Sequence, residues 1–226
     1  MADVVLIAGL WMEASSWDDV ARELEGLGHR PIPVRLPGAD DRSTSATLED
    51  QLAAVLEAVD SADHPVVVGH SAAASLAWMA ADRRPDDVRQ VMLVGGFPTP
   101  DGQPYADFFD IEDGVMPFPG WGPFEGPDSD DMDEATKQRF AESAVPVPAG
   151  VATGVVELTD ERRYSVPATL VCPEFSPDDA REWIAAGDLP ELSRAQRVDF
   201  VDLDSGHWPM LTCPDVMARA IHDNIV

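Results

Sequence analysis

The sequence has few basic residues. Its 226 residues include 15 lysines and arginines against 42 aspartates and glutamates, which gives a formal net charge of -27. Lys137 is the only lysine in the chain. Binding to nucleic acid or to an anionic membrane surface depends on clustered basic side chains, so we expect neither as a partner. The acidic excess bears on solubility and says nothing direct about chemistry.

Cysteines and long apolar runs are also scarce. Cys172 and Cys213 have no metal-ligand spacing, and two thiols in an intracellular chain are usually buried small apolar residues. We therefore expect neither a disulfide nor a metal site. No apolar run reaches the length of a membrane span, and residues 1–10 lack the basic leader and cleavage site of a secretory signal. These features predict a cytoplasmic protein.

Short β-branched runs alternate with longer stretches of helical period. The runs predicted as strands are 4–8, 31–36, 66–69, 91–94, 169–172 and 198–203, and the helical patterns are 18–27, 48–59, 72–82, 177–186 and 214–225. Thr47 is a candidate N-cap for the second helix. Such alternation predicts a single α/β domain, with a mostly parallel sheet and helices on both faces. Ligands of these sheets bind beyond the carboxyl ends of the strands.

One long segment interrupts this alternation. Residues 97–165 are rich in proline, glycine and aromatic residues, and contain one helical pattern from 129 to 144 with Ser129 as its candidate N-cap. A connection of this length between two core strands is too large for an ordinary loop. We predict a small cap inserted before the last two strands, with residues 1–96 and 166–226 forming the core. The cap aromatics either line a pocket or pack the cap onto the core.

The most informative local motif is Gly69-His70-Ser71-Ala72-Ala73, where a β-branched run meets an alanine-rich helix. A serine at a sharp strand-to-helix turn projects clear of both elements. Only small residues allow the close approach that such a turn needs, and Ala73 replaces the second glycine of G-x-S-x-G. Ser71 is therefore the candidate nucleophile, and we expect His70 to be a packing or pocket residue.

A serine hydroxyl needs a base to remove its proton, and the chain offers five histidines. His207 lies between the last predicted strand and the final helix, at the same predicted sheet edge as Ser71. This is the position that a general base requires. His29 and His64 precede strands at the opposite edge, where we expect surface residues, and His222 falls within the last helical pattern.

Two backbone N–H donors near the nucleophile would form an oxyanion hole. One candidate is the N–H of Ala72, at the start of a helix. The other is the N–H of Leu10 in the loop after the first strand, with that of Trp11 as the alternative. The candidate substrate contacts come from the same loops and from the cap: Trp11, His70, Phe97, Trp121 and Trp208.

With these motifs the chain resembles a small, single-domain member of the α/β-hydrolase family. The residues that carry the resemblance are Ala8-Gly9-Leu10-Trp11 in place of the family's His-Gly-x, Leu36-Pro37-Gly38, the elbow at Ser71, Val94-Gly95-Gly96-Phe97-Pro98 and Gly206-His207. The order serine, cap, histidine agrees with that family. The last hundred residues are similar to the plant methylesterase and hydroxynitrile lyase branch and to related bacterial esterases.

The chain departs from that family at the acid that orients the histidine. The family places an aspartate roughly nine residues after a proline such as Pro167, and here that position is Ser176. The nearest carboxylates are Glu174 on one side and Asp178 and Asp179 on the other. We take Glu174 as the third member of the triad. Asp178, Asp179 and a Ser–His dyad without an acid are the alternatives.

The residues and the resemblance together imply a serine hydrolase of a carboxylic ester, lactone or thioester. Ser71 would form an acyl-enzyme with His207 as general base, without a metal or organic cofactor. The cap aromatics indicate a small-molecule substrate with an apolar or aromatic acyl or alcohol part. A cofactor-independent lyase and a non-catalytic binding protein on the same fold stay open, as does the choice between monomer and homodimer. The resemblance implies that a hydroxynitrile lyase of the plant type has a lysine near the histidine. Lys137 falls in the predicted cap instead, which argues against that lyase.

Overall fold

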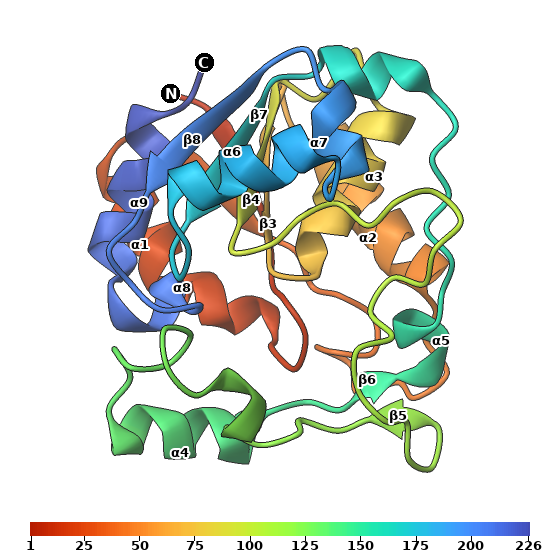
Figure 1. The fold of residues 1–226 in the computed structure, drawn as a ribbon, viewed down its shortest axis with the longest axis vertical. Coiled ribbons are helices and arrows are strands. Elements are labelled where there is room, and N and C mark those ends of the chain that lie inside the picture. Colours follow the sequence, from red (N-terminus) through yellow and green to blue (C-terminus); the bar gives the residue numbers. More distant parts are fainter.

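The computed structural model describes residues 1–226, and its centre is a six-stranded sheet in the order β2-β1-β3-β4-β7-β8 (Figure 1). Every neighbouring pair of strands is parallel, so all six carboxyl ends lie along one edge. The strands are β1 (Asp3–Ile7), β2 (Arg30–Pro33), β3 (Val66–His70), β4 (Gln90–Val94), β7 (Ala168–Cys172) and β8 (Val198–Asp202). The predicted α/β class is confirmed.

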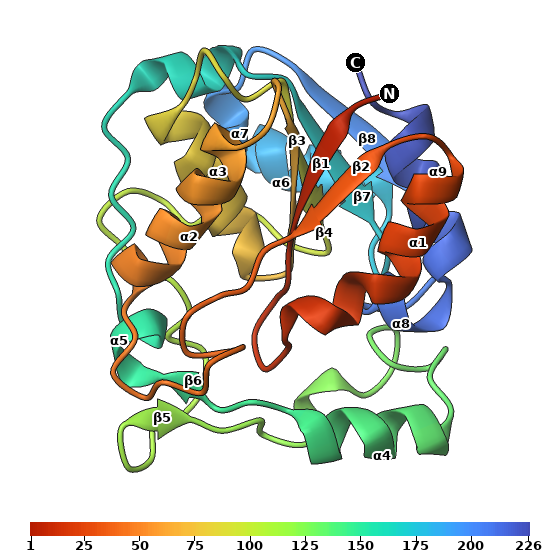
Figure 2. The ribbon, with the colours of Figure 1, turned by 180° about the vertical axis from the view of Figure 1, so that it is seen from behind.

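Helices cover both faces of the sheet and bury its central strands. β3, β4 and β7 bury every residue, and β1 buries all but its first. Figures 1 and 2 show α1 (Asp18–Gly26) and α9 (Pro214–Asp223) on one face, with α2 (Leu48–Asp60) and α3 (Ala73–Arg83) on the other. This packed core holds the strand ends, and the loops that follow them, in defined positions.

The core has four further helices. They are η1 (Ala14–Trp17), α6 (Pro177–Ala186), α7 (Pro190–Arg194) and α8 (Pro209–Thr212). Thr47 is the N-cap of α2, as predicted, because its side chain accepts from the Asp50 N–H while the Asp50 carboxylate accepts from the Thr47 N–H. None of the helices has both the length and the apolar character needed to cross a lipid bilayer.

Most of the segment 97–165 lies beyond the carboxyl ends of the strands (Figures 1 and 2). Its elements are β5 (Val115–Met116), η2 (Gly122–Phe124), α4 (Glu134–Ser143), β6 (Val147–Pro148), α5 (Ala149–Ala152) and η3 (Glu161–Ser165). β5 and β6 pair as a small antiparallel sheet. After α5 the chain runs back to the amino ends of the strands, because the parallel strand β7 must start there. The boundaries of core and cap stay a prediction.

The helix in the cap is shorter than the sequence pattern predicts. α4 begins at Glu134 and its N-cap is Asp133, whose carboxylate accepts from the Thr136 N–H at 2.7 Å. The prediction of a start at Ser129 is wrong. Ser129 is buried, and its hydroxyl donates to the carbonyl of Phe124 in the preceding turn. Aspartate is as good an N-cap as serine, and the serine is already satisfied in this turn.

A buried arginine anchors the end of the cap segment to the core. Arg163 in η3 is only 4% exposed. Its Nε donates to Glu191 of α7 at 2.9 Å and its Nη1 donates to Asp82 of α3 at 3.2 Å. Burial of a guanidinium is costly unless carboxylates compensate its charge. The cluster therefore ties η3 to two core helices.

Candidate active site

The candidate nucleophile lies at a strained turn between β3 and α3. Ser71 has a φ of 55°, in the left-handed region that non-glycine residues seldom occupy. Its N–H donates to the carbonyl of Val94 at 2.8 Å, which joins the turn to β4. A side chain at Gly69 would overlap the carbonyl of Ala73, and one at Gly96 would overlap the backbone of Ser71. Small residues on both sides therefore make this turn possible.

A continuous chain of hydrogen bonds leads from Ser71 to a carboxylate. His207 Nε2 lies 2.9 Å from Ser71 Oγ, and His207 Nδ1 lies 2.7 Å from Glu174 Oε1. The side chains of His207 and Glu174 are each 14% exposed. Because an ionised carboxylate only accepts, Nδ1 carries the proton and donates to Glu174. The neutral ring then has its Nε2 lone pair free to accept from the Ser71 hydroxyl.

The structure separates Glu174 from the two other candidate acids. Glu174 follows β7 and reaches His207, whereas Asp178 pairs with Arg181 and Asp179 forms the capping box of α6 with Ser176. Both aspartates are thus engaged at the start of α6. Of the three carboxylates, the one at the histidine is Glu174.

A glycine leaves the space that Glu174 and His207 occupy. Gly95, at the end of β4, has a φ of 56°, and a Cβ built there would lie 3.2 Å from both Glu174 Oε2 and His207 Nδ1. The second carboxylate oxygen of Glu174, Oε2, is buried and has no hydrogen-bond partner in the chain. A larger residue than glycine at the end of β4 would therefore crowd the contact between Glu174 and His207.

His70 supports the backbone of the histidine loop. It is 1% exposed, and its Nε2 lies 2.7 Å from the carbonyl oxygen of His207. Burial, reinforced by the neighbouring His207, holds the pKa of His70 well below its ordinary value. The ring is therefore neutral, and because a carbonyl only accepts, Nε2 is the protonated nitrogen that donates. His70 connects the Ser71 turn to the loop that carries His207.

The cap also contacts this loop, through a residue that sequence reasoning missed. The N–H of His207 donates to the carbonyl of Asp128 at 2.8 Å. A side chain at Gly206 would overlap Asp131 and Asp128. Partial burial raises the pKa of the Asp128 carboxyl, and the negative charge of Glu174 acts in the same direction. Nothing in the sequence around Asp128 distinguishes it from the other acids of the cap.

The loop after β1 lies directly against the Ser71 turn. A Cβ built on Gly9 would lie 2.7 Å from His70 Nδ1 and 3.2 Å from Ser71 Cβ. The N–H groups of Leu10, Trp11 and Ala72 donate to no acceptor within the protein. Unpaired N–H groups beside a serine are the donors that an oxyanion hole requires. Both predicted donors, and the alternative at Trp11, are therefore free.

A small cavity of about 50 Å³ adjoins Ser71. Three of the predicted substrate contacts, Trp11, His70 and Trp208, line it. Its complete lining is Leu10, Trp11, His70, Ser71, Phe108, Phe109, Phe124, His207 and Trp208. The three phenylalanines were not among the predicted contacts, although they belong to the aromatic-rich cap segment. Both predicted roles of the cap aromatics therefore occur. Some rings, such as Phe109 and Phe124, line the cavity, and others, such as Phe118 and Phe140, pack against neighbouring rings.

Two predicted contacts lie outside this lining. Phe97 packs against Phe175 and Trp183, with ring centroids 5.3 and 5.8 Å away. Trp121 packs against Trp208 at 5.3 Å, and its indole N–H donates to the Lys137 carbonyl. Whether these two rings contact substrate stays a prediction. Lys137 is also absent from the cavity lining.

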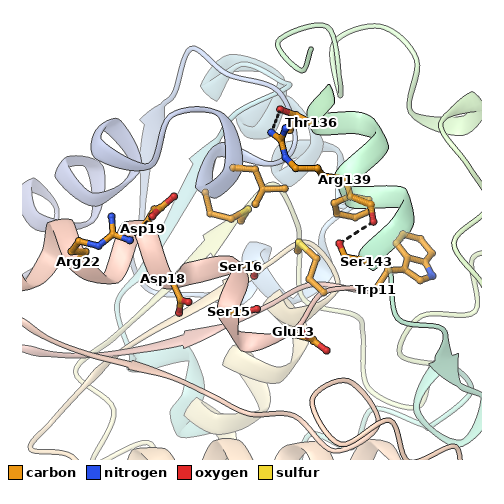
Figure 3. Close-up of a pocket in the computed structure, with 14 residues that line it drawn as sticks. Trp11, Glu13, Ser15, Ser16, Asp18, Asp19, Arg22, Thr136, Arg139 and Ser143 are labelled. Carbon is orange, nitrogen blue, oxygen red and sulfur yellow. Dashed lines mark hydrogen bonds and ion pairs between the residues drawn. The ribbon is translucent and has the colours of Figure 1, made fainter. Parts of the chain in front are cut away.

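A second space, larger than the cavity at Ser71, does not have Ser71 in its lining. It is a groove of about 500 Å³ between the η1–α1 segment and the cap helix α4 (Figure 3). Arg22 and Asp19 from α1 and Arg139 from α4 are among its lining residues. Trp11 belongs to the lining of both the groove and the small cavity at Ser71. Trp11 is the one residue that the two linings share.

Comparison with known proteins agrees with this architecture. The model of the alpha/beta hydrolase family matches residues 4–220. An extracellular alpha/beta-hydrolase from a Paenibacillus species, said to share structural and functional homology with tobacco salicylic acid binding protein 2, has a similar structure. The TM-score is 0.80 at 22% identity, over 99% of this chain and 98% of that one.

Two further solved structures share the fold at low identity. The methylesterase MES16 from Arabidopsis aligns with a TM-score of 0.76 and 14% identity, over 99% of this chain and 98% of that chain. A pyrethroid hydrolase from Sphingobium faniae JZ-2 aligns with a TM-score of 0.71 and 20% identity, over 98% and 96%. A search of curated protein sequences gives no match.

Proposed function

Because this chain belongs to the alpha/beta hydrolase family, we propose that it is a serine hydrolase that cleaves a carboxylic ester, lactone or thioester. Ser71 is the nucleophile, His207 the general base and acid, and Glu174 the acid that orients His207. The relatives named above as a methylesterase and a pyrethroid hydrolase support ester chemistry for this architecture. The substrate is a small molecule that reaches the cavity above Ser71.

The hydrogen-bonded chain from Ser71 through His207 to Glu174 is the observation that carries the proposal. As Ser71 Oγ attacks the carbonyl carbon, its proton passes to His207 Nε2. The charge that develops on the ring is stabilised by the Glu174 carboxylate at Nδ1. His207 then donates the proton to the leaving alcohol or thiol. Water attacks the acyl-enzyme in the same way and releases the acid.

The free N–H groups beside Ser71 complete the chemistry. The N–H groups of Leu10 and Ala72 donate to the oxygen that becomes negatively charged in the tetrahedral intermediate. Neither group has to break a bond within the protein before it does so. Preorganised donors of this kind usually supply the largest single contribution to the rate. The chain itself supplies the nucleophile, the base and the oxyanion donors, and water is the second reactant.

Labelling with a fluorophosphonate probe tests the proposal directly. We expect the wild-type protein to be labelled at Ser71, and Ser71→Ala and His207→Ala to lose labelling because the nucleophile or its base is gone. Ser75→Ala is the matched control, since Ser75 lies on the same helix and its hydroxyl bonds Thr99 instead. Its labelling should equal that of the wild type. Labelling that survives Ser71→Ala would overturn the mechanism.

A panel of ester, lactone and thioester substrates then defines the bond that is cleaved. Turnover of any of the three that disappears in Ser71→Ala supports hydrolysis at this site. A labelled protein that turns over none of them contradicts the proposed hydrolase and favours lyase chemistry. A folded protein that the probe does not label at all is the result expected of a binding protein.

A further inference from the structure

The size of the cavity at Ser71 restricts what the enzyme can bind there. Its volume is about 50 Å³, whereas a dry apolar cavity of about 150 Å³ is what binds benzene in an engineered protein. A benzene ring therefore has no room above Ser71 in this structure. A methyl or ethyl group does.

The walls of the cavity are supported from behind. The Trp11 ring contacts Phe109, Phe118 and Phe124, with centroids 5.4 to 5.9 Å apart, and its indole N–H donates to the Met116 carbonyl. Trp208 is held in the same way by Phe124 and by two rings of the second layer, Trp121 and Phe140. Because these rings are packed on both sides, the cavity cannot expand by moving one of them alone.

One residue of the cavity lining is largely exposed. Phe108 is 61% exposed, whereas Leu10, Trp11, His70 and Trp208 are each at most 9% exposed and the other lining residues are half-buried. The cavity therefore opens to solvent on the side of Phe108 and is closed on the side of Trp11. The side of Phe108 is therefore the most open path for a group that must leave the site during the reaction.

We propose that this enzyme, given the serine hydrolase function above, is specific for short acyl groups, acetyl and propionyl, and accepts bulky or aromatic alcohols. The acyl group stays bonded to Ser71 after the alcohol has left. It must therefore fit the enclosed space between Trp11, Phe124 and Trp208. The alcohol leaves by the open side and lies against Phe108 before it does so. An apolar or aromatic part of the substrate thus belongs to the alcohol.

Trp11 determines how long an acyl chain can be. It is the residue shared by the cavity at Ser71 and by the groove of about 500 Å³ beside α4 (Figure 3). Truncation of its indole joins the two spaces, so that a longer chain can extend from Ser71 into the groove. Phe124 lines only the small cavity. Its truncation enlarges that cavity by one ring without opening the groove.

Two ester series on the wild-type enzyme test the proposal. In the first, p-nitrophenyl esters run from acetate to octanoate; in the second, acetates carry alcohols from ethanol to naphthol. A methylene that meets a fixed pocket wall lowers kcat/KM by about tenfold or more. We therefore expect a steep fall beyond propionate in the first series. In the second series we expect kcat/KM not to decrease with the size of the alcohol, once the effect of the leaving-group pKa is taken into account.

Variants show which ring sets the limit. We expect Phe124→Ala to move the optimum to butyrate or hexanoate, and Trp11→Ala to accept octanoate. Phe124→Leu is a second, milder variant should the alanine variant fail to fold. Phe200→Ala removes a half-buried ring on β8, outside the cavity, and should keep the wild-type preference. The ratio of octanoate to acetate turnover is the measurement.

The possible results separate this inference from the function on which it rests. Probe labelling at Ser71 with a flat acyl series, or with a fall in the alcohol series instead, overturns the short-acyl specificity and leaves the hydrolase intact. An unchanged acyl preference in Trp11→Ala and in both Phe124 variants overturns the role of the cavity walls. Absence of Ser71 labelling overturns the hydrolase itself.

Discussion

The strand ends and the cap meet at Ser71, and they are built in different ways. At the strand ends, Ser71, His207 and Glu174 are joined by hydrogen bonds of 2.7 to 2.9 Å, and each residue follows a parallel strand of the sheet. In the cap, short elements are held by aromatic rings in contact with one another. Directional bonds set atomic positions, whereas ring packing sets the shape of a space. We infer that the strand-end loops perform the chemistry, and that the aromatic rings of the cap select the substrate together with Trp11 and Trp208 of the core.

The largest expected effect is in the core. Glu174→Gln should lower kcat by about 10³- to 10⁴-fold, because an amide no longer stabilises the imidazolium or keeps its tautomer. KM should change little, since Glu174 does not line the cavity. The matched control is Asp178→Asn, an acid that pairs with Arg181 at the start of α6. The measurement is the steady-state kcat of both variants on one ester. If kcat of Glu174→Gln stays within a few-fold of the wild-type value, Glu174 is not a member of the triad.

The anchor of the cap should matter for stability more than for chemistry. Arg163→Met leaves the buried carboxylates of Asp82 and Glu191 without their cation. Removing one partner of a buried ion pair costs about 3–5 kcal/mol. We expect the free energy of unfolding, measured by urea denaturation, to fall by that amount. Arg181→Met, which breaks an exposed pair with Asp178, should change it by less than about 1 kcal/mol. Equal losses in the two variants would contradict this picture.

Variants of His70 test whether its hydrogen bond to the His207 carbonyl fixes the position of the catalytic base. His70→Leu removes the donor to the His207 carbonyl and should lower kcat by about ten- to a hundredfold, because a small displacement of the base misaligns it with Ser71. His70→Gln retains an N–H donor and should recover part of the loss. The pH dependence of kcat/KM reports the state of His207 in each variant. Identical kinetics in Leu and Gln variants would leave His70 a packing residue only.

The smallest effect concerns acid stability. The pKa of His70 is held well below its ordinary value in the folded protein. Below about pH 6.5, His70 therefore binds a proton in the unfolded chain and stays neutral in the folded chain. The stabilisation from a neutral His70 is complete above about pH 6.5 and is lost as the pH falls below it. His70→Gln should reduce the slope of unfolding free energy against pH between 7 and 5. The slope is at most about 1.4 kcal/mol per pH unit for one proton, and an unchanged slope would contradict the buried neutral ring.

The sequence predicted the core far better than the cap. Thr47, the strands and the Ser71 turn follow from local rules that act within a few residues, namely capping, β-branched runs and small residues at a close approach. The choice of Glu174 over Asp178 and Asp179 could not follow from such rules. It depends on which of three neighbouring carboxylates reaches the His207 loop, more than thirty positions away in the chain. The other two carboxylates bond to residues at the start of α6.

The cap shows the same limit more clearly. Its aromatic composition predicted a covering segment, but Phe108, Phe109 and Phe124 line the cavity while Phe97 and Trp121 do not. All five look alike in the sequence, because a ring carries no local signal of the neighbour it will meet. Asp133 was missed as the N-cap of α4 for a related reason, since serine and aspartate are equally good caps.

The amino-acid sequence by itself determined the alternation of strands and helices, the sharp turn at Ser71 and the loop position of His207. These depend on periodicity and on residue size, which are properties of short stretches. Tertiary structure alone decided that Glu174 meets His207, that His70 holds the His207 carbonyl, and that Trp11 closes a cavity of about 50 Å³. Those contacts join residues far apart in the chain, and only the packing of the whole core and cap brings them within bonding distance.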